Sequence, residues 1–423
     1  MIRTSSIKIS IIGLGYVGLP LAVEFSKLYN VIGYDIDIDR INSLNDGVDV
    51  TNEVDFYNLS KSKNLTFTSD LNKIIDSNIY IITVPTPVDI NKKPDLSILQ
   101  NATRMVAKII KKGDIIVYES TVYPGCTEEI CVPILENFSL LKYNIDFFCG
   151  YSPERINPGD KVNTLTKIKK VTSGSTKEIA IFIDDLYSSI IIAGTHLAPS
   201  IKVAEASKAI ENAQRDVNIS FVNELALIFD KMDIDTNDVL AAASTKWNFL
   251  NFKPGLVGGH CIGVDPYYLA SKSVELGYSP NVILSGRKVN ESMGKFIVEK
   301  CIKLLINNNF QINKSRALIL GITFKENCPD IRNTRVIDIY RELIKLDIQV
   351  DFHDPIANPK NVYDEYKISL LTKEKLTNYD LIIYAVSHQD FLNIDLLNLK
   401  SSEKAIIYDV KGVLPIEIVN ARL

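Results

Sequence analysis

The sequence of 423 residues predicts an α/β protein with two doubly wound domains joined by a long central helix. Three observations support this fold class. A β-branched run leads into a glycine-rich turn at Gly13-Leu14-Gly15-Tyr16-Val17-Gly18. A helical run without glycine, and without proline after Pro199, extends from about Ala198 to Asp230, on the order of 45 Å. A second alternation of strands and helices begins at Ala317.

Composition and charge narrow the class of protein. Hydrophobic residues make up 46% of the chain and charged residues 23%, which is ordinary for a globular protein. The net charge of -4 argues against a general nucleic-acid binder, because such proteins usually carry a basic excess. No apolar run reaches the roughly 18 residues of a membrane span. The 6 cysteines form no CxxC pair, which favours free thiols in a reducing compartment, so we expect a cytoplasmic protein.

The glycine-rich turn lies in the setting that a dinucleotide requires. Strand 7–12 precedes it and helix 19–27 follows it, so the phosphates would lie at a helix N-terminus. Gly13 permits the tight turn, Gly15 lets the pyrophosphate approach the backbone, and Gly18 lets helix and strand pack closely. The sequence therefore predicts a Rossmann-like domain.

The strand that follows, 31–34, predicts which dinucleotide is bound. It ends in Asp35, about 20 residues after the turn. This carboxylate is placed to accept hydrogen bonds from the adenosine ribose and would repel a 2′-phosphate. We therefore predict NAD, although Arg40 is a counter-signal because a nearby arginine can accommodate that phosphate.

Hydroxyl side chains follow two further strands of this domain, 79–84 and 114–118. In an open parallel sheet the ligand lies beyond the carboxyl ends of the strands. These hydroxyls are candidates to face the nicotinamide, or they cap ordinary turns; they belong to Thr83, Thr86, Ser120 and Thr121.

A later strand, 147–150, leads into Ser152-Pro153-Glu154-Arg155, which we interpret as a structured loop. The lysines that come after it are interpreted as a solvated face; they are Lys161, Lys167, Lys169 and Lys170.

The central helix carries polar side chains at a spacing that places them along one face, and they are Glu205, Lys208, Asn212 and Arg215. Such a row on a mostly apolar helix is either a solvent-exposed stripe or the wall of a site. A short helix is expected over 235–243, with Thr236 or Asn237 as a candidate cap, and a long helix over 281–307 follows.

Between these helices lies Gly258-Gly259-His260-Cys261, with Asp265 close behind. Glycine allows a ligand to approach the backbone, so Cys261 is a candidate nucleophile that could hold an acyl group as a thioester. The alternative is a small buried side chain, which is common for free cysteine. The 4 histidines show no metal-ligand spacing, and we predict no metal.

The C-terminal third predicts a second Rossmann-like unit without the glycine motif. Its expected strands are 317–320, 348–352, 380–386 and 405–410. Lys325 and Lys411 follow two of these strands and are either point charges for a phosphate or surface lysines.

Taken together, these residues resemble the UDP-glucose/UDP-mannuronic acid dehydrogenase family over essentially the whole chain. The motifs that carry the resemblance are Gly13-Leu14-Gly15-Tyr16-Val17-Gly18-Leu19-Pro20, Ser120-Thr121-Val122, Ser152-Pro153-Glu154, Lys208 with Asn212, Gly258-Gly259-His260-Cys261 with Asp265, and Phe324-Lys325. The segments 150–161 and 245–255 are similar to the branch that acts on UDP-N-acetylhexosamines. Within that branch the chain resembles the Vi-polysaccharide type UDP-N-acetylglucosamine 6-dehydrogenases.

The resemblance implies a division into an NAD-binding domain at 1–197, a helical dimerisation domain with the cysteine loop at 198–308, and a UDP-binding domain at 309–423. It implies a homodimer that forms through the central helix. It also implies a four-electron oxidation of the sugar C6 alcohol to a carboxylate by NAD, through a Cys261 thiohemiacetal and thioester. The pathway would be surface polysaccharide synthesis, for O-antigen or capsule.

The family also implies roles for individual residues. Catalysis would use Cys261, Lys208, Asn212, Asp265, Thr121 and Glu154. Contacts to NAD would come from Gly13, Gly15, Tyr16, Val17, Gly18, Asp35, Arg40, Thr83, Pro85, Thr86, Ser120, Thr121 and Arg332. Contacts to the UDP-sugar would come from Glu154, Arg155, Lys208, Asn212, Arg215, Lys246, Asn251, Gly258, Lys325 and Lys411, with Lys246 reaching over from the neighbouring subunit.

Two departures from the glucose-specific branch favour a bulkier 2-acetamido sugar. Pro158 stands where that branch often has a second glutamate, and Lys246 stands where an arginine is usual. UDP-N-acetylglucosamine is the substrate we expect, with UDP-N-acetylgalactosamine, UDP-N-acetylmannosamine and UDP-glucose as alternatives.

Two other classes of function compete with this reading. A two-electron hydroxyacid dehydrogenase of the 6-phosphogluconate dehydrogenase kind would have no use for Cys261 or for a second α/β domain. A non-enzymatic NAD-binding regulator would leave the set of Lys208, Asn212, Cys261 and Asp265 as a coincidence.

Overall fold

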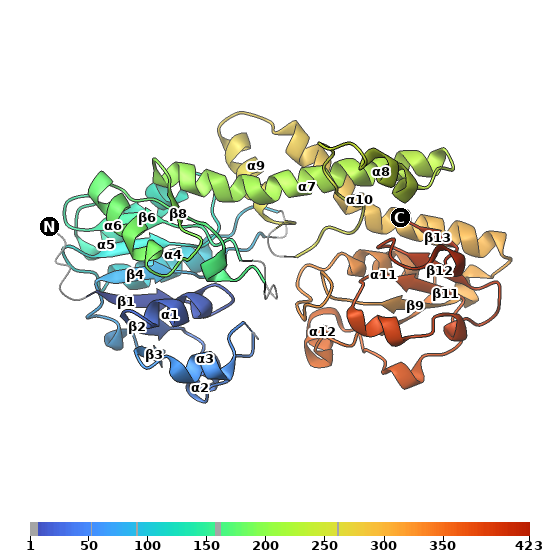
Figure 1. The fold of residues 1–423 in the computed structure, drawn as a ribbon, viewed down its shortest axis with the longest axis horizontal. Coiled ribbons are helices and arrows are strands. Elements are labelled where there is room, and N and C mark those ends of the chain that lie inside the picture. Colours follow the sequence, from blue (N-terminus) through green and yellow to red (C-terminus); the bar gives the residue numbers. More distant parts are fainter. Residues whose placement is uncertain (1–6, 52, 90–91, 157–161, 260–261) are drawn as a thin grey trace. The chain divides into compact units, whose positions relative to one another are not determined.

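A computed structural model describes residues 7–51, 53–89, 92–156, 162–259 and 262–423. The chain forms two compact units, and each has its own parallel sheet (Figure 1). The first unit comprises Met1–Glu211 and Tyr267–Tyr278, and the second comprises Asn212–Pro266 and Ser279–Leu423. The central helix α7, Ile201–Lys231, contains the boundary between them.

The first unit alternates strands and helices along the chain. Its strands are β1 (Lys8–Ile12), β2 (Asn30–Tyr34), β3 (Leu65–Thr68), β4 (Ile79–Ile82), β5 (Ile115–Tyr118), β6 (Phe148–Tyr151), β7 (Lys170–Thr172) and β8 (Thr195–Leu197). Its helices are α1 (Gly18–Ser26), α2 (Ile38–Asn45), α3 (Phe56–Lys61), α4 (Ser97–Ala107), α5 (Val132–Ser139) and α6 (Lys177–Ser188), together with most of α9 (Asp265–Glu275).

Six of these strands form one sheet in the order β3-β2-β1-β4-β5-β6, and all of its neighbours are parallel. The order is the one expected of a dinucleotide-binding sheet, and the strand order reverses beside β1. The glycine-rich turn follows β1 directly, so it lies at the carboxyl edge next to that reversal.

Both faces of this sheet are covered, because side chains alternate along each strand. In β4, Ile79 and Ile81 pack with residues of α1 and α6, whereas Tyr80 and Ile82 pack with residues of α4 and α5. The strands are therefore apolar on both faces, and this explains why they read as continuous β-branched runs in the sequence.

The second unit contains the C-terminal sheet and the helices around it. Its strands are β9 (Arg316–Leu320), β10 (Gln349–His353), β11 (Leu381–Tyr384), β12 (Ile406–Asp409) and β13 (Ala421–Arg422). Its helices are α8 (Thr236–Ala243), α10 (Asn281–Asn307), α11 (Val336–Ile344) and α12 (Pro359–Tyr366). The sheet runs in the order β10-β9-β11-β12-β13 with all pairs parallel, so the predicted doubly wound fold is confirmed.

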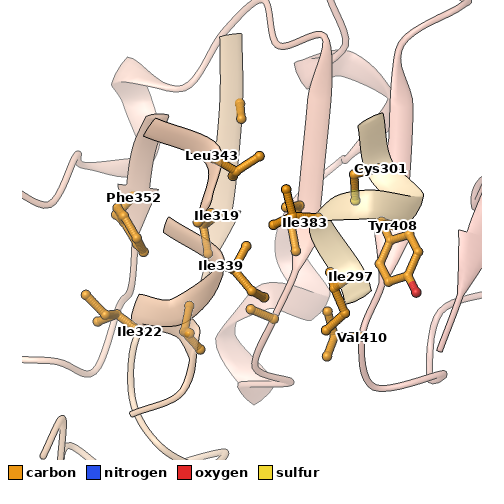
Figure 2. Packing of buried hydrophobic residues seen from close by; sticks show 14 of the residues in the cluster. Ile297, Cys301, Ile319, Ile322, Ile339, Leu343, Phe352, Ile383, Tyr408 and Val410 are labelled. Carbon is orange, nitrogen blue, oxygen red and sulfur yellow. The ribbon is translucent and has the colours of Figure 1, made fainter. Parts of the chain in front are cut away.

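One core of the second unit lies between the sheet and helices α10 and α11. Figure 2 shows Ile297 and Cys301 of α10 beside Tyr408 of β12 and Ile383 of β11. Ile319 of β9 lies in the same cluster, whereas its neighbours in β9, Leu318 and Leu320, belong to the cluster on the opposite face. α10 is thus held to the second sheet along its C-terminal half.

Helix α8 begins differently from the sequence prediction, which placed the cap at Thr236 or Asn237. The N-cap is Asp235, whose carboxylate accepts hydrogen bonds from the backbone N–H groups of Asn237 and Asp238. Arg422 also donates to this carboxylate over 2.8 Å. An ionised side chain with a second partner outcompetes the neighbouring threonine and asparagine for the cap position.

Candidate functional site

The glycine-rich turn has a geometry that only glycine allows at two positions, for different reasons. Gly13 has a φ of +95°. A Cβ at Gly18 would lie 1.9 Å from the Gly13 carbonyl oxygen and 2.5 Å from Thr83 Oγ1, so close packing excludes a side chain there. A Cβ at Gly15 would meet no protein atom within 4 Å. The fold therefore does not itself require glycine at position 15, and the open space fits a pyrophosphate.

Asp35 and Arg40 both bind the backbone of this turn, at Leu14. The Leu14 N–H donates to Asp35 Oδ2 over 2.8 Å, and Arg40 Nε and Nη2 donate to the Leu14 carbonyl over 2.9 and 2.8 Å. Arg40 Nη1 also lies 2.8 Å from Asp49 Oδ1, and both side chains are buried. The guanidinium is thus engaged beneath the turn, where it stabilises the loop conformation.

The hydroxyl groups at the carboxyl ends of β4 and β5 tie the ends of β1, β4 and β5 together. Thr83 Oγ1 donates to the Gly13 carbonyl over 2.7 Å, Ser120 Oγ donates to the Val84 carbonyl over 2.6 Å, and Thr86 Oγ1 donates to the Thr121 carbonyl over 2.6 Å. The hydroxyl protons therefore serve the turns, which is the alternative that the sequence left open. Among the other predicted contacts, Tyr16 and Val17 are half-buried and Pro85 is exposed.

A buried ion cluster lies behind the Ser-Pro-Glu loop. Lys170 Nζ lies 2.7 Å from Glu119 Oε2 and 2.7 Å from Glu154 Oε2, and Tyr187 donates to the other Glu119 oxygen. Interpreting Lys170 as part of a solvated face was wrong, since its side chain is only 2% exposed, while Lys167 and Lys169 are exposed as expected. Carboxylates distant in sequence compensate the buried ammonium.

Burial and charge set the protonation of this cluster. Burial raises the pKa of Glu119 to about 7 against the opposing effect of Lys170. Burial alone would also raise the pKa of Glu154, but the Lys170 ammonium and two backbone N–H donors hold it below its ordinary value. Desolvation opposes the charge on Lys170, yet its two carboxylate partners raise its pKa. Glu154 is therefore the carboxylate that stays ionised.

The polar row on α7 is mostly buried. Glu205, Lys208 and Asn212 are each less than a tenth exposed, whereas Arg215 is exposed. Glu205 accepts hydrogen bonds from the backbone N–H groups of Gly125 and Thr127. The first three residues of the row are therefore buried, and they do not form a solvent-exposed stripe.

Two predicted catalytic residues of the second unit are in direct contact. Asn212 Nδ2 donates to Asp265 Oδ2 over 2.6 Å, and both side chains are buried. Asp265 begins helix α9, where its charge is favourable in the first turn. A separate ion pair lies in the first unit. Arg155 binds Glu211 through two guanidinium nitrogens, and its Nη2 lies 2.6 Å from Glu211 Oε1. Arg155 also donates to the Lys169 carbonyl.

His260 and Cys261 lie outside the described residues, but the segment that leads to them is anchored within the second unit. The Asn223 side chain donates to the Gly255 carbonyl over 3.0 Å and accepts from the Gly255 N–H over 2.8 Å. Asn333 Nδ2 donates to the Gly259 carbonyl over 2.9 Å, and the Gly259 N–H donates to the Asn333 carbonyl.

A Cβ at Gly258 would lie 2.5 Å from the Asn333 carbonyl oxygen, so the approach requires glycine. Earlier in this segment, Lys246 and Asn251 are exposed.

A small hollow in the second unit brings together three residues that the sequence analysis assigned to the UDP-sugar, and they are Gly258, Lys325 and Lys411. Lys411 lies 3.5 Å from Glu326. Arg335 also lines the hollow, and its Nη2 and Nη1 lie 3.7 Å from Glu291 and 3.4 Å from Asp338. Three cationic side chains around one hollow form an arrangement that an anion would stabilise. Arg335 was not among the predicted site residues.

Arg332 lies in the same loop and forms an ion pair with Asp330, with Nη2 to Oδ2 at 2.6 Å. Among the residues that the structure describes, no group of three or more histidine, cysteine or carboxylate side chains could hold a metal ion. Within that part of the chain, too, no helix has the length and apolar character to span a bilayer.

Three family models match consecutive parts of the chain. They are the NAD binding domain, the central domain and the UDP binding domain of the UDP-glucose/GDP-mannose dehydrogenase family, at residues 7–191, 202–292 and 318–416.

The chain is also 54% identical to the UDP-N-acetyl-D-glucosamine 6-dehydrogenase of Salmonella typhi, over 100% of both chains. It is 54% identical to the protein of that name from Pseudomonas aeruginosa, over 96% of this chain and 97% of the relative. Among solved structures, the UDP-D-ManNAc dehydrogenase of Pyrococcus horikoshii superposes with a TM-score of 0.89 at 29% identity, covering 98% of each chain.

Proposed function

Because the chain belongs to the UDP-glucose/GDP-mannose dehydrogenase family, we propose that it oxidises the C6 alcohol of UDP-N-acetylglucosamine to a carboxylate. The chain is an NAD-dependent oxidoreductase, as the sequence predicted. The observation that carries the choice of sugar is the 54% identity, over essentially full length, to two UDP-N-acetyl-D-glucosamine 6-dehydrogenases. The product would serve surface polysaccharide synthesis, as an O-antigen or capsule precursor.

The cofactor would lie on the glycine-rich turn, where Gly15 leaves open space and the N-terminus of α1 faces the phosphates. NAD supplies a hydride acceptor for each of the two oxidations. Asp35 would accept the ribose hydroxyls while it holds the Leu14 N–H. Arg40, Thr83 and Ser120 would act through the backbone they bind.

The carbon chemistry would pass through Cys261. The alcohol loses a hydride and a proton and becomes an aldehyde. The thiolate adds to that aldehyde and forms a C–S bond, and loss of a second hydride leaves a thioester. Water then attacks the carbonyl carbon, the C–S bond breaks, and the acid and the thiol are released. The balance is one alcohol, one water and two hydride acceptors per carboxylic acid.

Polar groups of the central segment would stabilise the charge that develops on the C6 oxygen. Lys208 offers an ammonium, and Asn212 offers an amide four residues further along the same helix. The contact between Asn212 and Asp265 fixes the amide orientation and leaves the carboxylate able to orient water or take a proton. Thr121 and Glu154 would hold the hydrolytic water.

The substrate phosphates would lie in the hollow lined by Lys325, Lys411 and Arg335. Two ammonium groups and a guanidinium complement a diphosphate. Gly258 lines the same hollow. Lys246, Asn251 and Arg215 are exposed and would contact the sugar, with Lys246 acting from a second subunit.

An assay of NADH release tests the proposed function. We expect two NADH per UDP-N-acetylglucosamine and a uronic acid product. UDP-N-acetylgalactosamine, UDP-N-acetylmannosamine and UDP-glucose should be slower, and free N-acetylglucosamine, which lacks the diphosphate, should not react. One NADH per sugar with an aldehyde product would contradict the proposal, and a higher kcat/KM for another sugar would replace the substrate assigned here.

A homodimer is part of the proposal. In the second unit, apolar side chains are exposed at Phe221 and Ile228 of α7, at Trp247 and at Val282 of α10. Exposed apolar groups of this size mark interaction surfaces when they form a patch. Light scattering should give twice the chain mass of 47.4 kDa. Phe221→Glu should weaken the dimer, whereas Phe138→Glu, an exposed phenylalanine of the first unit, should not. A wild-type monomer at micromolar concentration would refute it.

A further inference from the structure

Two backbone N–H groups and one ammonium account for most of the hydrogen-bonding capacity of Glu154. Its Oε1 accepts the backbone N–H groups of Arg155 and Ile156, each over 2.6 Å, and its Oε2 accepts from Lys170 over 2.7 Å. An ionised carboxylate offers about four acceptor sites. Three are used, so the group is fixed in orientation and keeps one acceptor site that a water molecule could use.

Lys170 is in turn held from behind. Its Nζ lies 2.7 Å from Glu119 Oε2, and Glu119 also accepts from Tyr187 of α6, which is fully buried. The chain Tyr187–Glu119–Lys170–Glu154 thus connects helix α6 to the Ser-Pro-Glu loop through four side chains. The other charged pair beside the loop is Arg155 with Glu211 of α7.

Stability alone is a weak reason for such a cluster. Taking charges out of water costs several kcal/mol per ion, and apolar residues of similar volume often serve as well or better. The cluster also contains two carboxylates for one ammonium, so the single positive charge compensates only one of them when both are ionised. Such an arrangement is typical of sites where a protonation state is being set.

We propose that Lys170 is a positioning residue for Glu154, and that Glu119 holds Lys170 in place for this task. Lys170 keeps Glu154 ionised and oriented, so that it takes the proton of the water that hydrolyses the thioester. This inference rests on the proposed function, in which Glu154 serves the hydrolytic water. It assigns a role to two buried side chains outside the residues that touch substrate or cofactor.

The direction of the pKa shift of Glu154 agrees with this geometry. Burial raises the pKa of Glu154, and the Lys170 ammonium more than offsets this effect together with two backbone donors. Without the ammonium, the pKa of Glu154 rises, so the base is protonated at a pH where the wild-type group is ionised. The acidic limb of the hydrolysis rate must then move to higher pH. Removing the charge of Glu119 leaves Glu154 as the one carboxylate that contacts Lys170. The acidic limb of the hydrolysis rate should then stay at the same pH or move to lower pH.

The test is rapid mixing of the full-length enzyme with NAD and UDP-N-acetylglucosamine. In Lys170→Met we expect a burst of two NADH per chain to persist, because both oxidations precede hydrolysis. The steady-state rate at neutral pH should fall about 10²-fold, as for loss of a general base. Intact-protein mass spectrometry should then detect the acyl-enzyme, and the rate should recover at higher pH.

Three further variants complete the experiment. Lys170→Gln keeps a polar side chain and should give the same pH shift, in case the methionine variant does not fold. Glu119→Gln should shift the limb in the opposite direction or not at all. Lys169→Met, an exposed neighbour, should behave as wild type.

An equal loss of burst and steady state in both Lys170 variants would mean a structural role and would overturn the inference, and so would unchanged hydrolysis. If neither Lys170 variant folds, a shift of the limb to higher pH in Glu119→Gln would overturn it. Failure of the proposed function is distinguishable, since the wild-type enzyme itself would then release no acid.

Discussion

Replacing Cys261 by serine is expected to reduce formation of the uronic acid by at least about 10³-fold, which corresponds to roughly 4 kcal/mol of activation free energy. A serine hydroxyl is far less ionised than a thiol near neutral pH and does not form a thioester. NAD affinity should be unchanged, because the glycine-rich turn that would hold the cofactor is built from the first unit. Product analysis with a parallel NAD titration measures both quantities.

The remaining cysteines provide the control. Cys126, Cys131, Cys149, Cys301 and Cys328 are all buried. Burial raises the pKa of Cys149 and of Cys301, so these thiols should react slowly. Rapid alkylation by iodoacetamide should therefore modify one thiol per chain, and UDP-N-acetylglucosamine should protect it. Cys328→Ala should retain acid formation. If Cys261→Ser produced the acid at the wild-type rate, the proposed covalent intermediate at Cys261 would be wrong.

Alanine at Gly18 and alanine at Gly15 are expected to fail in different ways. At Gly18 the new Cβ would lie 1.9 Å from the Gly13 carbonyl oxygen, so helix and turn must separate. We expect a loss of about 3 kcal/mol in the free energy of unfolding, or roughly 6–12 °C in Tm. At Gly15 the Cβ meets no protein atom, so stability should change by less than about 0.5 kcal/mol.

The two variants separate again when NAD is titrated. Gly15→Ala should bind NAD about tenfold or more weakly, equal to roughly 1.4 kcal/mol, because the methyl group occupies the space left for the pyrophosphate. Calorimetry and thermal unfolding provide the two measurements. If Gly15→Ala kept full affinity, the pyrophosphate would have to bind elsewhere.

Local patterns were sufficient for five of the six strands of the first sheet and for the two longest helices, α7 and α10. The β-branched run before Gly13 and the helix after it predicted β1 and α1 to within a residue or so. The bounds of α10 agree with the sequence prediction, because Pro280 precedes the helix and polar asparagines follow it. Strands β3, β7, β8 and β13 were not predicted, since runs of two to four residues carry too little periodicity to be recognised.

The environment of Lys170 shows what local patterns cannot supply. In the sequence it is one of four lysines in a short stretch, which is typical of a solvated face. Its partners Glu119 and Glu154 reach it only when β5, β7 and the Ser-Pro-Glu loop are brought together by the fold. Arg335 was missed for a similar reason: it lies three residues after Arg332, but its contact with the hollow depends on the packing of the second unit.

For the site residues too, the sequence predicted their identity, whereas their contacts depend on the fold. The sequence identified Asn212 and Asp265 as polar residues with a shared task, and the structure adds the hydrogen bond between them. Thr83, Thr86 and Ser120 were correctly placed at strand ends, but the direction of a hydroxyl proton depends on which carbonyl lies nearest. Spacing along the chain does not contain that information.

The attachment of Gly255 by Asn223 has a consequence for how acid affects the enzyme. The anchoring side chain is an uncharged amide, which neither gains nor loses a proton between pH 4 and 10 at ordinary values. Its two hydrogen bonds to the backbone therefore do not depend on the protonation of Glu119, whose pKa burial raises to about 7. A fall in turnover on mild acidification should accordingly be reversible and immediate, as a protonation is, rather than slow, as a refolding of the loop before Cys261 would be.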